Sequence, residues 1–111
     1  VPAAVYHLKN LKFFLANSNE ISVLANSLKD LAVVEVLDFS NNLIESFPGV
    51  VIPSLTSLNL DSNQISALPP AIGSFVNIRY LHLRNNKLDS VPSSICKLTK
   101  LENLSLSGNP L

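Results

Sequence analysis

Three residues could form a catalytic set: Ser57, Asp61 and His82. A serine, a histidine and an aspartate can carry out acyl transfer, in which the histidine activates the serine hydroxyl and the aspartate orients the histidine. That chemistry also needs a sharp turn that exposes the serine and backbone N–H groups that bind the oxyanion. The chain has three glycines, and none of them lies in a nucleophile turn or a phosphate-binding loop. We therefore expect this segment not to be an enzyme.

The remaining reactive side chains are few. Cys96 is the one cysteine, which excludes an internal disulfide and any multi-cysteine metal site. We expect its thiol to be partly buried or at an edge, and we expect no metal and no cofactor. His7 is expected at the surface on the back of the fold. Scarce cysteine favours a reducing compartment, so we predict a cytoplasmic, intracellular location.

The overall composition excludes two classes of partner. The 111 residues include eight basic and eight acidic side chains, and 47% of the residues are hydrophobic. Balanced charge gives no electrostatic attraction to nucleic acid or to anionic membranes. No apolar run approaches the ~18 residues of a membrane span, and no signal-peptide pattern opens the chain. We expect neither a nucleic-acid partner nor a membrane span.

An internal repeat positions these side chains. The template L-x-x-L-x-L-x-x-N-x-L, whose positions we number 1 to 11, has five matches, and their starts are 23, 21, 23 and 23 residues apart. The second half of the unit recurs as "VPAAVYHLKNL", "LPPAIGSFVNI" and "VPSSICKLTKL". The five matches are Leu11–Ile21, Val34–Ile44, Leu55–Ile65, Ile78–Leu88 and Leu101–Leu111.

The repeat divides the chain into one continuous block. We predict four full units, one to four, and a fifth that has only its front half, preceded by the back half of another. The first and last pieces lead us to expect a block from a larger protein, next to flanking repeats or domains. The boundaries are 1–10, 11–33, 34–54, 55–77, 78–100 and 101–111.

These in-register copies resemble the leucine-rich repeat family over the whole chain. The "LPxxIxxLxxL" half and the 23-residue length are similar to the intracellular Ras-group subfamily. The resemblance implies an α/β repeat fold, a leucine-rich repeat solenoid. Such a solenoid is a curved right-handed coil with a parallel β-sheet on its concave face and short helical, 3₁₀ or extended segments on its convex face. It also implies a protein partner, and the subfamily suggests a small GTPase.

The alternation of side chains agrees with that architecture. In Tyr80-Leu81-His82-Leu83-Arg84 apolar and polar residues alternate, which predicts a short strand with one buried face. Unit two is two residues short after Phe47-Pro48, and Pro53 with its β-branched neighbours predicts an extended back segment there. In unit one Ala25 replaces the proline, which should make little difference to the coil.

Position 9 of the template is expected to have a structural role. The backbone turns after each strand and leaves buried N–H and C=O groups, to which an Asn side chain offers both an acceptor and a donor. Losing one such side chain would cost ~1–3 kcal/mol for an unpaired buried group. The expected ladder is Asn19, Asn42, Asn63, Asn86 and Asn109.

Positions 3, 5 and 7 face the concave side and could contact a partner. Phe13, Leu15 and Val36 form an apolar patch there, which either binds a partner or packs against a flanking segment. The second candidate is a polar cluster, which either binds a partner or is a solvated face with an Asp61–Arg84 ion pair. Its members are Tyr80, His82 and Arg84 with Asp61, Asn59 and Asp38.

The sequence leaves three functions open. The first is a protein-interaction module that binds its partner on the concave face, within an intracellular signalling or scaffold protein. The second is a regulatory segment of a larger enzyme, such as a fungal adenylyl cyclase or a deadenylase. The third is a spacer, which the variation between units disfavours. Plant receptor kinases are disfavoured, because their units are longer and carry a Gly-x-Ile-Pro run that is absent here.

Overall fold

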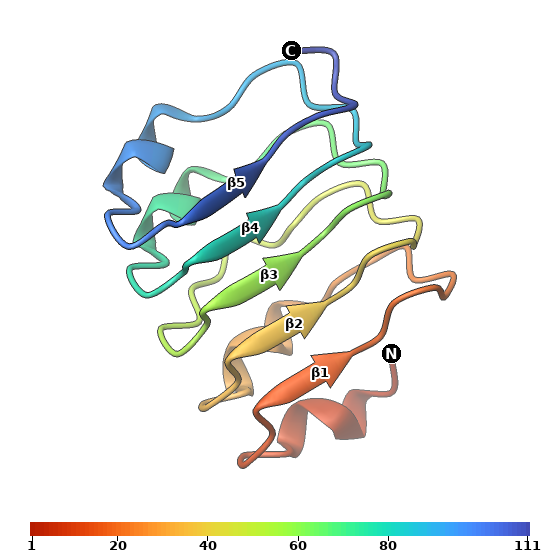
Figure 1. Cartoon of the computed structure of the whole chain (residues 1–111). Coiled ribbons are helices and arrows are strands. Elements are labelled where there is room, and N and C mark those ends of the chain that lie inside the picture. The colour runs from red at the N-terminus through yellow and green to blue at the C-terminus, as the bar shows by residue number, and fades with distance from the viewer.

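The computed structural model describes all residues, Val1–Leu111, and consists of a single stack of coils (Figure 1). Five short strands lie side by side in chain order and are parallel throughout. Figure 1 shows the strands on one side of the coil and the helices on the other. The leucine-rich repeat solenoid expected from the sequence is confirmed. The strands are β1 Phe13–Leu15, β2 Val36–Asp38, β3 Ser57–Asn59, β4 Tyr80–His82 and β5 Asn103–Ser105.

The strands pair in register, position by position. Ser57 on β3 lies opposite Tyr80 on β4, and Asn59 lies opposite His82. The same pairing continues at every strand pair, so equivalent template positions form straight rows across the sheet. Because side chains alternate along a strand, positions 3 and 5 share the outer face of the sheet.

Four short 3₁₀ helices return the chain behind the sheet. Each follows a residue in extended conformation, and Ala25 (φ −77°, ψ 150°) takes the same geometry as Pro69 (φ −68°, ψ 149°). The replacement of proline therefore makes little difference, as predicted. No helix occurs between β2 and β3, which confirms a non-helical back segment in unit two. The helices are η1 Ala3–His7, η2 Asn26–Asp30, η3 Pro70–Ser74 and η4 Ser93–Lys97.

None of these helices has the length and apolar character that a membrane crossing requires.

At position 8 of the template, just after each strand, the chain turns sharply. Positive φ angles between 56° and 60° occur there at Ser18, Asn41, Ser62 and Asn85. Gly108 (φ 75°) occupies the same position, and an added Cβ there would lie 2.1 Å from Oδ1 of Asn85. The turn after each strand thus has one shared left-handed geometry.

The leucine positions fill one continuous core between sheet and helices. Burial is complete in the middle of the stack, where Leu37, Leu58 and Leu81 are 0% exposed. It is less at the two outer strands, where Phe14 is half-buried and Leu104 is 37% exposed. The gradient follows from stacking, because an inner unit has a neighbour on each side.

Candidate partner-binding face

The Asn side chains at position 9 tie each turn to the preceding unit. Asn63 Nδ2 donates to the carbonyl oxygens of Phe39, Leu60 and Asp61 at 3.0, 3.1 and 3.2 Å. Its Oδ1 accepts the backbone N–H of Ile44 at 3.0 Å. Asn86 makes the equivalent bonds, with the N–H of Ile65 as its donor partner in the preceding unit.

Asn42 and Asn109 also bond to the preceding unit, whereas the side chain of Asn19, in unit one, does not. Asn42 Oδ1 accepts the N–H groups of Asn19 and Ile21, and Asn109 Oδ1 accepts that of Leu88. Asn19 is exposed, and its Nδ2 donates within its own unit. The ladder side chains therefore bond to the backbone of the coil and point away from the outer face.

A patch of apolar side chains lies on the outer face at β1 and β2. Phe13 is 60% exposed and Leu15 is 63% exposed. Val36 is half-buried and pairs directly with Phe13 across the two strands. The structure thus brings these three residues together, as their template positions predicted. Exposed large apolar side chains in one cluster are a feature of contact surfaces.

The polar cluster centres on β4. Tyr80 is 41% exposed, Arg84 is exposed, and His82 is half-buried. His82 Nδ1 lies 3.4 Å from Ser105 Oγ, and this serine donates to Asn103 Oδ1 at 2.8 Å. His82 is therefore engaged toward β5, and it makes no hydrogen bond to Ser57 or Asp61.

The ion pair considered between Asp61 and Arg84 is not formed. Asp61 Oδ1 instead accepts the backbone N–H of Arg84 at 2.7 Å. The single ion pair in the structure joins Arg79 Nε to Glu102 Oε2 at 3.5 Å. Asp38 is used in a similar way, because its Oδ1 accepts from Ser40 N at 3.0 Å and Ser40 Oγ at 2.6 Å. Asp61 therefore bonds to the backbone of the next unit and Asp38 to its own turn, which leaves the Arg84 guanidinium unpaired.

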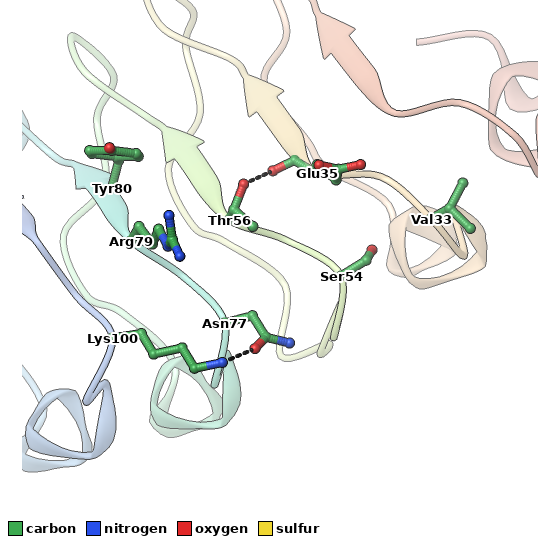
Figure 2. A pocket seen from close by; sticks show the side chains of 8 residues that line it. All are labelled: Val33, Glu35, Ser54, Thr56, Asn77, Arg79, Tyr80 and Lys100. Atoms are coloured by element: carbon green, nitrogen blue, oxygen red, sulfur yellow. Dashed lines mark hydrogen bonds between the residues drawn. The ribbon is translucent and has the colours of Figure 1, made fainter.

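A hollow of about 560 Å³ opens beside the outer face, where the chain enters β2, β3 and β4 (Figure 2). Our sequence reasoning missed it. A signal was present at position 2, where Thr56 is the one short uncharged side chain in a row of long charged ones. The lining residues are Val33, Glu35, Ser54, Thr56, Asn77, Arg79, Tyr80 and Lys100.

The other singled-out groups lie outside this face. Cys96 is exposed on η4, so the expectation that its thiol is partly buried was wrong. Burial raises the pKa of Tyr6 on η1 above 10.0, and a hydrogen bond to the backbone of Ala25 partly offsets that increase. No group of three or more His, Cys, Asp or Glu side chains is arranged to hold a metal ion.

Comparison with known protein sequences gives a family and longer relatives. A family profile described as "Leucine rich repeat" matches residues 53–111. The chain is 33% identical over 110 residues to the flightless-1 homologue of Caenorhabditis elegans, covering 95% of this chain and 9% of that protein. It is 39% identical over 108 residues to the adenylate cyclase of Podospora anserina, covering 95% of this chain and 5% of that protein. The chain thus spans under a tenth of either relative.

Two solved structures share the fold over nearly the whole chain. A leucine-rich repeat protein of Leptospira interrogans superposes with a TM-score of 0.95 at 32% identity, over 99% of this chain and 29% of that one. The ectodomain of the Arabidopsis thaliana receptor kinase GASSHO1/SCHENGEN3, in complex with CASPARIAN STRIP INTEGRITY FACTOR 2, gives a TM-score of 0.83 at 25% identity. That match covers 98% of this chain and 14% of the ectodomain.

Proposed function

Because the chain belongs to the leucine-rich repeat family, we propose that it is a protein-interaction module whose partner docks on the outer face of the sheet. One observation carries the proposal. Large side chains stand exposed on that face: Tyr80 and Arg84, whose types are enriched among interface anchors, and the apolar Phe13 and Leu15. The leucine and Asn positions are used by the coil itself, so these outward positions are the ones free for contact.

The frame behind these side chains supports binding with little rearrangement. In-register strand pairing and the Asn hydrogen bonds hold each outward residue at a defined place in the sheet. A preorganised surface loses less conformational entropy on association than a flexible one. The GASSHO1/SCHENGEN3 ectodomain, which has the same fold, is in complex with another molecule, CASPARIAN STRIP INTEGRITY FACTOR 2. A complex with another molecule is thus compatible with the fold.

The test replaces Tyr80, His82 and Arg84 together with alanine and measures the affinity for the native partner recovered by crosslinking. We expect affinity to fall by about tenfold or more, because interface anchors of these types each contribute about 1–2 kcal/mol or more. A matched triple variant changes His7, Lys29 and Lys97 on the helices, on the other side of the coil. Unchanged affinity in the first variant, with its circular dichroism intact, would move the site off this face.

A second candidate function is regulation of a catalytic domain in the same protein. The 39% identity to an adenylate cyclase favours it over the spacer function. The test compares the enzymatic activity of the full-length protein with that of a variant from which this repeat block is deleted. Equal activity and equal stimulation in the two proteins would exclude a regulatory role. A small GTPase partner and a cytoplasmic location stay predictions from the resemblance and the composition.

A further inference from the structure

The hollow described above adjoins the outer face through one shared residue. Tyr80 lies at position 3 of β4 and also lines the hollow. The other lining residues precede the strands, so the hollow lies at the edge of the sheet where β2, β3 and β4 begin (Figure 2). A partner that covers Tyr80 therefore reaches this opening without leaving the sheet.

The hollow exists because two short side chains interrupt a row of long ones. Thr56 lies between Glu35 and Arg79 at position 2 of neighbouring units, and Ser54 lies behind it. Both hydroxyl groups are already used by the backbone. Thr56 Oγ1 donates to the carbonyl oxygen of Glu35 at 3.1 Å, and Ser54 Oγ donates to that of Val34. The floor thus offers space but no unpaired hydroxyl proton.

The amide in the hollow is hydrogen-bonded at both its nitrogen and its oxygen. Asn77 Nδ2 donates to the carbonyl oxygen of Pro53 at 2.8 Å, and its Oδ1 accepts from Lys100 Nζ at 2.9 Å. The amide therefore holds the lysine ammonium at the rim. An ammonium group has three N–H donors, so two of those on Lys100 stay available.

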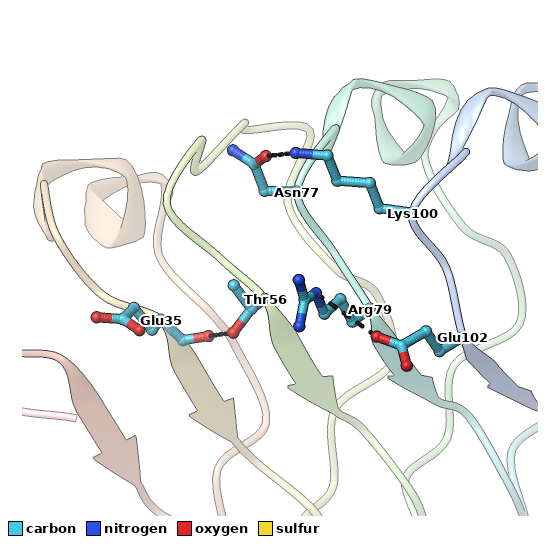
Figure 3. A network of polar contacts seen from close by, with 6 residues as sticks. All are labelled: Glu35, Thr56, Asn77, Arg79, Lys100 and Glu102. Atoms are coloured by element: carbon cyan, nitrogen blue, oxygen red, sulfur yellow. Dashed lines mark hydrogen bonds and ion pairs between the residues drawn. The ribbon is translucent and has the colours of Figure 1, made fainter.

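Two cationic side chains of the hollow, Arg79 and Lys100, keep N–H donors that have no partner. Arg79 uses its Nε for Glu102, whereas its terminal nitrogens make no hydrogen bond or ion pair and lie on the Thr56 side (Figure 3). The Tyr80 hydroxyl has no hydrogen-bond partner either. The one carboxylate in the lining, that of Glu35, is turned away from Thr56 in Figure 3. Two cationic side chains with unpaired N–H groups, Arg79 and Lys100, against the single carboxylate of Glu35 give the hollow an excess of positive charge that matches an anionic group.

We propose that this hollow receives the carboxylate of an Asp or Glu side chain presented by the protein partner. Arg79 binds it through its two terminal nitrogens, Lys100 adds a second positive charge, and Tyr80 closes the rim. The planar guanidinium fork suits a carboxylate, because two parallel N–H···O bonds form at once. The proposal rests on the proposed function and deepens it by naming the group that the partner presents.

The pair between Arg79 and Glu102 does not prevent this contact. The two side chains are 59% and 55% exposed, so their attraction is screened by water and salt. It occupies only the Nε edge of the guanidinium and leaves the terminal nitrogens free. In such an open site the carboxylate contributes to selectivity and to the rate of association as well as to affinity.

The experiment selects short random peptides from a display library on the intact chain. We expect the selected peptides to be enriched in Asp and Glu. We expect their affinity to fall about tenfold in an Arg79→Gln/Lys100→Gln variant, because charge-assisted pairs of this kind are lost. The matched control, Lys9→Gln/Lys12→Gln, removes the same charge next to β1 and should stay within about twofold. Replacing the acidic residue of the peptide with its amide should reproduce the tenfold loss.

Four outcomes would overturn the proposal: no selected peptide, peptides without acidic enrichment, equal affinity for the Arg79→Gln/Lys100→Gln variant, or displacement by inorganic phosphate but not by acetate. The last would identify a site for free phosphate. A His82→Ala/Arg84→Ala variant separates the two proposals. If only this variant loses affinity, the hollow fails and the outer face stands. If only the Arg79→Gln/Lys100→Gln variant loses affinity, the outer-face proposal fails and the hollow stands.

Discussion

A residue's position in the repeat, more than its type, decides its role in this molecule. Asn63 at position 9 is buried and bonds to four backbone groups of two units. Asn17 at position 7 is an exposed asparagine whose side chain makes no hydrogen bond. The first is needed by the coil, and the second is available to solvent or a partner.

The first prediction concerns this contrast. Asn63→Ala should lower the free energy of unfolding by at least about 2 kcal/mol, because the N–H of Ile44 and buried carbonyl oxygens lose their partners. Asn17→Ala should change it by less than about 0.5 kcal/mol. Urea denaturation followed by circular dichroism measures both. Similar values for the two variants would contradict a structural role for position 9.

At this scale the sequence predicts which positions point outward but not every bond they make. The apolar patch at Phe13, Leu15 and Val36 follows from the template alone. The use of Asp61 does not, because a carboxylate on the outer face can accept a backbone N–H of the next unit as readily as it can pair with an arginine. The choice of the Arg84 backbone N–H depends on the exact path of the chain.

At the scale of elements, the helices behind the sheet pack closely at one point. A Cβ added to Gly73 on η3 would lie 2.5 Å from the backbone oxygen of Ser94 on η4. That distance is too short for a carbon–oxygen contact, so the two helices can approach only because residue 73 lacks a side chain. Gly49, in the non-helical back segment of unit two, has nothing within 4 Å of its hypothetical Cβ.

The second prediction uses these two glycines as a matched pair. Gly73→Ala should destabilise the fold by about 1–3 kcal/mol, because η3 and η4 must move apart to admit a methyl group. Gly49→Ala should be neutral within about 0.5 kcal/mol or slightly stabilising, since it only restricts the unfolded chain. Thermal unfolding of the two variants compares them directly. A loss at Gly49 that equals the loss at Gly73 would exclude close packing as the cause.

The elements themselves were largely predictable. The alternation around Leu81 and Leu83 predicted a strand, and Pro53 predicted the missing helix in unit two. The close approach at Gly73 was not predictable, because it depends on the distance between helices of successive units. The presence of a glycine in one unit does not by itself reveal how close the two helices lie.

At the scale of the whole molecule, equivalent leucines differ in what they contribute. Position 4 holds Leu58 and Leu81, both 0% exposed, and Leu104, 37% exposed. The residues are chemically identical, and the difference arises from the number of neighbouring units. Stability in such a stack is close to a sum over units and the interfaces between them.

The third prediction follows from that gradient. Leu58→Ala should cost about 2–5 kcal/mol, as for fully buried leucines in other cores. Leu104→Ala should cost less than about 1.5 kcal/mol, because it leaves a smaller cavity and removes less buried area. Urea titrations measure both free energies of unfolding, and the two can be compared if the variants have equal m-values. Equal costs would show that burial in the stack is more even than the structure describes.

The period of the sequence was enough to predict the order and direction of the strands, since each unit can only stack on the next. The hollow at the sheet edge was harder to predict. Its lining comes from several successive units, and its chemistry depends on the direction in which Arg79 turns its guanidinium. The row of position 2 side chains suggests a gap at Thr56, but the sequence does not specify the direction in which each side chain points.

The hydrogen bonds between units have a mechanical consequence. The Asn side chains at position 9 of units two to five each bond across one boundary only, and each strand pairs only with its neighbours. A pulling force along the stack therefore acts on each boundary between units in series. The coil can yield at its weakest boundary while the units on either side keep their shape, which gives it extensibility without a dedicated hinge.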